Sequence, residues 1–126
     1  MDTISNKDDR KLKVAVGATK NAPESLVHSQ FGRCDWFLIF ENETGMTKAI
    51  ENSYAEVETG AGIGCAQDLI QEGVEAVISG QVGPRAYEVL TQAGVEIYLA
   101  PADISAQEAY DKFLSKELLK MEIQKF

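Results

Sequence analysis

The stretch TGAGIGCAQ at residues 59–67 places three glycines at alternate positions, followed by a cysteine and the start of a helical pattern. Glycine accepts positive φ and lets another backbone or a ligand come close. A glycine-rich turn that leads into a helix leaves the first-turn N–H groups unpaired at the positive end of the helix dipole. The stretch therefore predicts an anion-binding helix start, where the position of Cys65 would favour its thiolate.

The sequence on either side predicts a sheet flanked by helices. Apolar or aromatic runs indicate strands at residues 13–18, 36–41, 46–51, 76–80 and 95–100. Helical spacing continues from the glycine turn to Gly73, and it recurs over residues 83–94 and from Ser105, which forms a capping box with Glu108. Residues 115–125 are expected to continue as a terminal helix. Strand–helix alternation requires parallel strands with right-handed crossovers, so we expect an α/β protein with three α/β/α layers.

Domain boundaries follow from the polar N-terminus. We expect residues 1–12 to be a disordered tail and residues 13–126 to be a single domain. Residues 42–45 predict a hairpin loop with Gly45 at positive φ, so residues 46–51 pair antiparallel with residues 36–41. The polar pattern of residues 46–51 indicates an edge strand, which leaves homodimerisation through it open.

Composition excludes several classes of protein. The formal net charge of the 126 residues is −8, which argues against nucleic acid or an anionic membrane as a partner. Two cysteines are too few for a secreted disulfide framework, and no apolar run is long enough to span a bilayer. We expect a cytoplasmic protein.

Three glycine-containing loops are the candidate site. They contribute Phe31, Gly32 and Arg33 from the first loop, Gly60, Gly62 and Gly64 from the second, and Gly80 and Gly83 from the third. Ligands of open α/β sheets bind outside the carboxyl ends of strands, where the second and third loops should lie side by side. Two helix N-termini would then face one anion, and the charge of Arg33 would complete the site.

Each feature also has a purely structural interpretation. The glycines can serve as tight turns, and Cys65 and Cys34 as small core residues. His28 is expected to be a solvated loop residue and Arg85 to be exposed. With a single histidine and no carboxylates on the central strands, no catalytic set can be assembled, so we expect a protein that is not an enzyme.

The ordered set of loops resembles one family. The resemblance rests on FGR at residues 31–33, the strand at residues 36–40, GAGI at residues 60–63 and GQVGPRAYEVL at residues 80–90. Together they resemble the dinitrogenase iron–molybdenum cofactor biosynthesis family, which includes NifX/NifY-type carriers, the C-terminal domain of NifB and small stand-alone members. The similarity extends from residue 13 to about residue 118.

The resemblance implies a ribonuclease H-like fold with a five-stranded mixed sheet. It also implies binding or carriage of an iron–molybdenum-type metal–sulfur cluster or its precursor, with donor and acceptor proteins as partners; a relative, the orange protein, holds a molybdenum–copper sulfide cluster. Many members have histidine where this chain has Gln30, so Cys65, and after it Cys34, are the candidate metal ligands. Two alternatives remain open: a thiol-based redox or sensor protein that uses both cysteines, and a module that binds a small phosphate or nucleotide.

Overall fold

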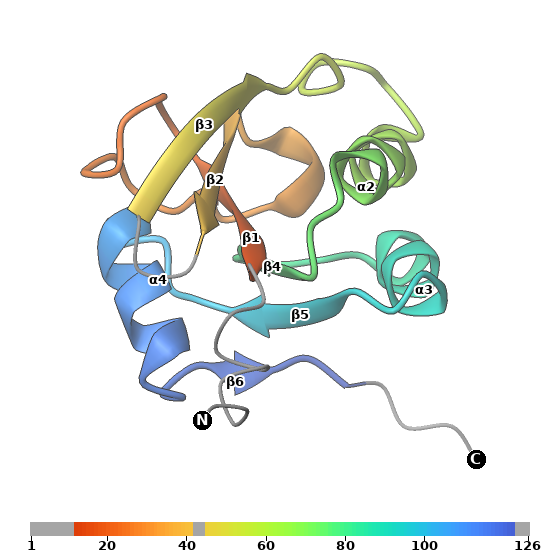
Figure 1. The fold of residues 1–126 in the computed structure, drawn as a ribbon. Coiled ribbons are helices and arrows are strands. Elements are labelled where there is room, and N and C mark those ends of the chain that lie inside the picture. Colours follow the sequence, from red (N-terminus) through yellow and green to blue (C-terminus); the bar gives the residue numbers. More distant parts are fainter. Residues whose placement is uncertain (1–11, 42–44, 123–126) are drawn as a thin grey trace.

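The fold alternates strands and helices along most of the chain. The computed structural model describes residues 12–41 and 45–122, which form β1 (Lys13–Ala18), the short 3-10 helix η1 (Phe31–Arg33), β2 (Trp36–Glu41), β3 (Gly45–Glu51), α2 (Ala61–Glu72), β4 (Ala76–Ser79), α3 (Pro84–Gln92), β5 (Glu96–Leu99), α4 (Ala106–Leu114) and β6 (Leu119–Lys120). The strands make one mixed sheet of order β3-β2-β1-β4-β5-β6 (Figure 1). β1, β4 and β5 are parallel, while β2, β3 and β6 are antiparallel to their neighbours.

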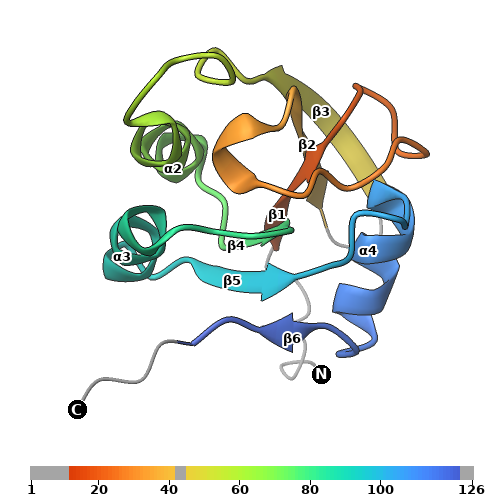
Figure 2. The same cartoon turned by 180° about the vertical axis from the view of Figure 1, so that it is seen from behind.

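Both faces of the sheet are covered. On one face, Phe37 and Val77 pack with Leu69 of α2 and Leu90 of α3. On the other face, the core strands pack against α4, whose Tyr110 stacks on the ring of Phe40 with centroids 4.6 Å apart. α2 and α3 therefore lie together on one side of the sheet and α4 on the other (Figures 1 and 2). The predicted α/β/α layering is confirmed.

The predicted C-terminal ends of α2 and α3, the cap of α4 and the positive φ of Gly45 are also confirmed. Gly73 ends α2 at φ 88°, and Gly94 follows α3 at φ 83°. The Ser105 hydroxyl accepts a hydrogen bond from the Glu108 N–H at 3.0 Å. Gly45 has φ 88°, as expected for the hairpin that joins β2 and β3, although residues 42–44 of this loop lie outside the described residues.

The expected five-stranded sheet and terminal helix are wrong. The sheet has six strands, because the chain turns after α4 and returns to the edge of β5 instead of continuing as a helix over residues 115–122, while residues 123–125 of the predicted helix lie outside the described residues. Lys116 adopts φ 62°, which ends the helical path, and the Met121 N–H then donates to the Ile97 carbonyl at 2.8 Å. The open backbone groups of β5 outcompete local helical propensity here. The likeness to ribonuclease H remains a prediction.

The expected N-terminal tail lies almost wholly outside the described residues. Its last residue, Leu12, is described and packs against the core beneath α4. Within residues 12–41 and 45–122, no helix is both long and apolar enough to cross a bilayer.

Candidate anion-binding site

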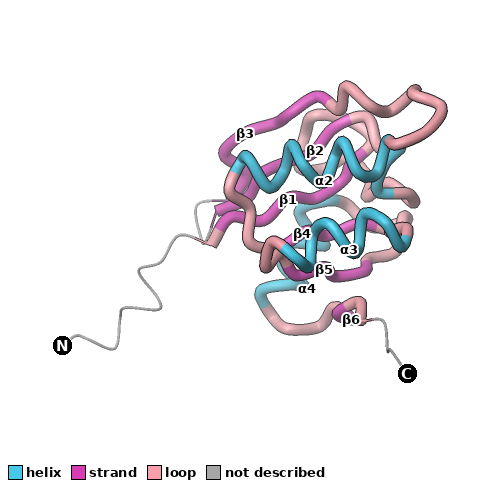
Figure 3. The backbone as a smooth tube through the Cα atoms, turned by 90° about the vertical axis from the view of Figure 1, so that its right-hand side faces the viewer, coloured by secondary structure: helices cyan, strands magenta, loops and turns pink. Residues whose placement is uncertain are grey.

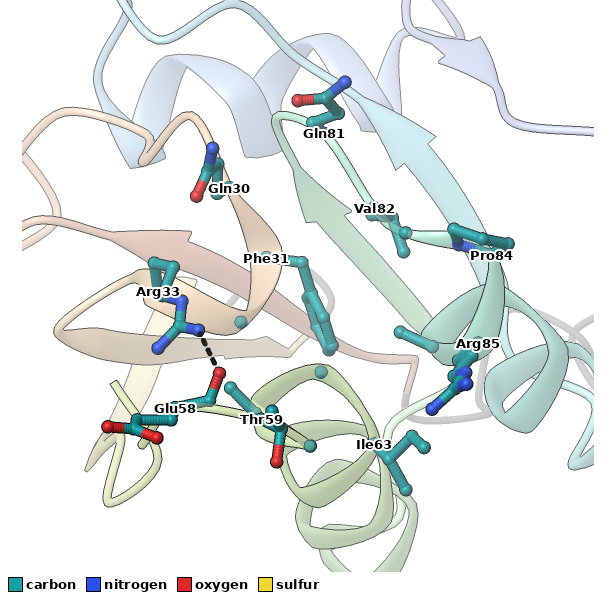
Figure 4. A pocket seen from close by; sticks show the side chains of 16 residues that line it. Gln30, Phe31, Arg33, Glu58, Thr59, Ile63, Gln81, Val82, Pro84 and Arg85 are labelled. Atoms are coloured by element: carbon teal, nitrogen blue, oxygen red, sulfur yellow. Dashed lines mark hydrogen bonds between the residues drawn. The ribbon is translucent and has the colours of Figure 1, made fainter. Parts of the chain in front are cut away.

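Three segments that are distant in sequence converge on one open pocket of about 580 Å³. They are η1 with the residue before it, the approach to α2, and the approach to α3 (Figure 4). The lining residues are Gln30, Phe31, Gly32, Arg33, Glu58, Thr59, Gly60, Ala61, Gly62, Ile63, Gln81, Val82, Gly83, Pro84, Arg85 and Ala86. The expectation that the three loops meet is confirmed.

Backbone pairing brings the first and third segments together. The Gln81 N–H donates to the Ser29 carbonyl at 2.7 Å, and the Phe31 N–H donates to the Gln81 carbonyl at 2.8 Å. These bonds extend the sheet beyond the carboxyl end of β4, where the approach to α3 begins. η1 is thereby held beside the start of α3.

Two helix N-termini open into the pocket. α2 follows Gly60, which has φ 81°, and α3 follows Gly83 with Pro84 as its first residue. The first backbone bonds of the two helices are donated by Gly64 and Tyr87, each at 2.9 Å, so the N–H groups of the preceding turn have no partner inside the helix. Within the described part of the chain neither end has a side-chain cap, and neither first turn contains an acidic residue. α2 and α3 run side by side (Figure 3), which directs both positive ends to the same place.

Two arginines stand on opposite sides of the pocket, with Phe31 between them (Figure 4). Arg33 is half-buried, and its Nη1 donates to the carbonyls of Ala55 at 3.0 Å and Val57 at 2.5 Å. Arg85, as expected, is exposed at the start of α3. Arg33 therefore ties down the segment before α2, whereas Arg85 is placed to meet a ligand. Reasoning from the sequence chose Arg33 and left Arg85 out of the site, although it directly follows the Gly83-Pro84 helix start.

The predicted site glycines differ in their place in the fold and in what a Cβ added to them would meet. Gly60 and Gly83 line the pocket, and a Cβ added to either would have nothing within 4 Å of it, whereas Gly62 and Gly64 lie inside α2 rather than in a turn. A Cβ on Gly64 would meet the Tyr54 ring at 2.5 Å, and one on Gly80 would meet the Ser29 backbone. Neither Gly64 nor Gly80 lines the pocket. At these two positions the close approach inferred from the sequence is made by the protein itself.

Gly32 and Gly62 bring η1 onto the first turn of α2. A Cβ on Gly32 would lie 3.0 Å from the Gly62 nitrogen, and a Cβ on Gly62 would lie 3.3 Å from the Ala86 Cβ of α3. Both residues line the pocket. Their small size lets the three segments meet.

The structure does not bring either cysteine to the pocket surface. Cys65 is 1% exposed, and its Sγ donates to the Asn52 Oδ1 at 3.1 Å. Cys34 is fully buried, with its Sγ 3.4 Å from the Phe31 carbonyl. Burial raises the pKa of Cys65 to about 12 and raises the pKa of Cys34, which the nearby Cys65 raises further. Both thiols are therefore protonated core groups at neutral pH, and the thiolate expected at Cys65 from its place near a helix start is wrong, because burial outweighs the helix dipole.

Among other metal-binding side chains of the described residues, only the Glu58 carboxylate lines the pocket. Within the described ranges, no three His, Cys, Asp or Glu side chains gather closely enough to hold a metal ion. His28 lies in the loop before η1, half-buried, with its Nδ1 3.0 Å from the Gln30 nitrogen. Gln30 itself faces the pocket, so a carboxamide stands where an imidazole ligand would lie.

The sequence model of the dinitrogenase iron–molybdenum cofactor family matches residues 11–116. The chain belongs to this family. The match covers every element that builds the pocket, so the converging loops are part of the family domain.

Similar proteins support this assignment. An uncharacterized protein of Methanocaldococcus jannaschii is 38% identical over 114 residues, which are 88% of this chain and 92% of that protein. The apo form of the orange protein from Desulfovibrio gigas has a TM-score of 0.82 at 27% identity, covering 86% of this chain and 92% of that one. A Thermotoga protein described as a candidate NifB protein of the DUF35 family has a TM-score of 0.75 at 33% identity, again covering 86% and 92%.

Proposed function

We propose that this protein binds an iron–molybdenum-type metal–sulfur cluster, or a precursor of one, as a cargo that it passes from a donor to an acceptor protein. The observation that carries the proposal is the convergence of two uncapped helix N-termini and Arg85 on one open pocket. A sulfide-rich metal cluster is an anion, and backbone N–H groups at helix starts are suited to hold one.

The donor set of the pocket favours a carrier over a protein with a resident metal centre. No cysteine or histidine is among the 16 described lining residues, and Glu58 is the one carboxylate among them, so the wall offers N–H groups and guanidinium groups rather than thiolate or imidazole ligands. A cargo held in this way leaves without breaking a metal–thiolate bond. Thr59 and Glu58 supply a hydroxyl and a carboxylate to the wall, but no hydrogen bond joins their side chains in the described residues, which favours carriage without chemical conversion.

Family membership supports the class of cargo, because the family is described by the iron–molybdenum cofactor of dinitrogenase. The pocket also keeps the phosphate-binding alternative open, since helix N-termini bind phosphate by the same contacts. The thiol-based alternative has less support, because Cys34 and Cys65 are buried with raised pKa values and reactive cysteines are exposed with lowered ones.

Anaerobic reconstitution tests the proposal. The protein is incubated with ferrous iron, tetrathiomolybdate and sulfide and then desalted, and bound metal is measured by elemental analysis and visible absorption. Arg85→Glu should lower retention by about tenfold or more, because charge-assisted contacts to the anion are lost and a repulsive charge is added. The matched control is Lys20→Glu, which makes the same charge change in the loop whose Ser25 carbonyl bonds the start of α4, across the sheet.

The cargo assignment would be overturned if the wild-type protein retained no metal, or if Arg85→Glu retained as much as Lys20→Glu. A thermal-shift series with phosphate and nucleotides tests the phosphate-binding alternative. Stabilisation by those ligands without metal retention would favour the phosphate-binding module.

A further inference from the structure

Asn52 is a buried polar residue that does not line the anion pocket. It follows β3 directly, is 8% exposed, and uses both ends of its amide. Its Nδ2 donates to the carbonyls of Gly32 at 3.2 Å and Cys34 at 2.7 Å. Its Oδ1 accepts from the Tyr54 N–H at 2.8 Å and from the Cys65 Sγ at 3.1 Å.

These four contacts are made with η1, with the segment that precedes α2 and with α2 itself. Gly32 and Cys34 belong to or follow η1, Tyr54 begins the segment that leads to Gly60, and Cys65 lies in α2. The backbone N–H of Asn52 adds a fifth bond, to the Asp35 carbonyl at 3.0 Å. One side chain thus joins three segments that are separate in sequence.

Two of these partners, Gly32 and Tyr54, in turn make tight contacts with α2. The Gly32 backbone lies against the Gly62 nitrogen, in the first turn of α2, and the Tyr54 ring lies against Gly64 two residues further along the helix. Asn52 and the N-terminus of α2 are thus connected through closely packed groups. A shift at Asn52 would therefore move the N–H groups that open into the pocket.

We propose that Asn52 is a positioning residue of the anion pocket: it holds η1 and the first turn of α2 in the arrangement that lets their groups face one ligand. The identity of the ligand rests on the proposed function, whereas the positioning geometry around Asn52 does not depend on it. Cys65 then contributes as a hydrogen-bond donor to Asn52 and not as a metal ligand, which gives the buried thiol a role that neither a ligand nor a simple packing assignment provides.

The chemistry of the two residues restricts what can replace them. Only a carboxamide offers two N–H donors and an acceptor oxygen in this shape. Aspartate has the same outline but places an oxygen opposite the Gly32 and Cys34 carbonyls, leaving those acceptors unsatisfied. Serine at position 65 keeps a donor for Oδ1, whereas alanine removes it.

The test compares Asn52→Asp with Asn21→Asp, which makes the same change at an exposed position. Binding of tetrathiomolybdate is measured by equilibrium dialysis, and amide hydrogen exchange is measured without ligand. Asn52→Asp should bind about tenfold more weakly, as expected for losing hydrogen bonds to buried carbonyls. Its amides at Arg33 and Gly64, which donate to the Gln30 and Gly60 carbonyls, should exchange faster, while those of α4 keep their wild-type rates. Asn21→Asp should behave as wild type in both measurements.

If Asn52→Asp does not fold, the variants Cys65→Ser and Cys65→Ala test the positioning role. Cys65→Ser should bind tetrathiomolybdate within about twofold of wild type and Cys65→Ala several-fold more weakly, because only serine keeps the donor. Equal losses in both variants would overturn the positioning role, as would a folded Asn52→Asp with wild-type exchange and affinity. Faster exchange in Asn52→Asp together with no binding by the wild-type protein would support the positioning role and overturn the proposed cargo.

Discussion

The N-termini of α2 and α3 differ from the N-terminus of α4 in what their first-turn N–H groups meet. At α4 the Ser105 side chain caps the helix, and Glu108 places a negative charge in the first turn. In the described residues α2 and α3 have neither a side-chain cap nor a first-turn acid. α4 satisfies a first-turn donor with its own side chain, whereas α2 and α3 leave theirs facing the pocket.

The two faces of the sheet also assemble differently. On the α4 face, large side chains fill the space, with Tyr110 between the rings of Phe40 and Phe113. On the pocket face, backbone meets backbone at Gly80 and Gly32. The α4 face can adjust to a changed side chain by moving a rotamer, whereas a side chain added at Gly80 or Gly32 requires the main chain to move.

The largest expected effect comes from Gly80→Ala, which tests the backbone contact. A Cβ on Gly80 would overlap the Ser29 main chain, so we expect a loss of about 3 kcal/mol in the free energy of unfolding. Gly83→Ala is the control, because its φ of −71° suits alanine and a Cβ there meets nothing within 4 Å. Urea denaturation of both variants measures the difference, and equal stabilities would contradict the close contact.

Gly83→Asp should make the start of α3 resemble that of α4. Position 83 has the extended conformation of a capping residue, so the new carboxylate can accept from the first-turn N–H groups. We expect a gain of about 0.5–1 kcal/mol in stability together with about tenfold weaker binding of tetrathiomolybdate, because the cap occupies the donors and repels the anion. Isothermal titration beside urea denaturation measures both. Unchanged affinity would mean that the α3 end does not contact the ligand.

Ser105→Ala makes the opposite change at α4. Removing the cap should cost about 1 kcal/mol of stability, because the Glu108 N–H loses its acceptor. Affinity for tetrathiomolybdate should stay at the wild-type value, since α4 lies across the sheet from the pocket (Figure 2). A loss of affinity equal to that of Gly83→Asp would remove the distinction between the two kinds of helix end.

The smallest expected effect at neutral pH is that of Cys65→Ser on stability, which changes the thiol behind the pocket. Folding raises the pKa of Cys65 from 9.0 to about 12, so the unfolded chain loses this proton first as the pH rises. The stabilisation is complete below about pH 9 and is lost progressively as the pH approaches about 12. Cys65→Ser should show a shallower decline in urea-measured stability over this range. Burial also raises the pKa of Tyr98 to about 12, but Tyr98 is present in both proteins, so their difference reports Cys65. Identical slopes would contradict the burial of this thiol.

Much of the site could be predicted because its signals are local. Gly60, Gly83 and Pro84 mark helix starts by their backbone preferences, and the alternation of strand and helix places both starts at one edge of the sheet. The roles of Arg33 and Arg85 could not be separated from the sequence. Each follows a glycine-containing turn, and only the carbonyls of Ala55 and Val57, more than twenty residues from Arg33, distinguish the arginine that is engaged from the one that is exposed at the pocket.

Asn52 and the C-terminal segment show the same limit. Nothing around Asn52 in the sequence indicates burial, because its partners Gly32 and Cys65 come from η1 and α2. Likewise, residues 115–125 have helical spacing, yet Leu119 pairs with Leu99 at the open edge of β5. Only the assembled sheet presents that edge.

Local patterns were enough to predict the α/β alternation, the layers and the two glycine-led helix starts, because hydrophobic period and glycine or proline geometry act within a few residues. The tertiary structure decided the sixth strand, the burial of both thiols, the engagement of Arg33 and the network around Asn52. These depend on which backbone groups and which small residues meet across the fold, and free energies of burial and hydrogen bonding between distant segments are set only when those segments are in contact.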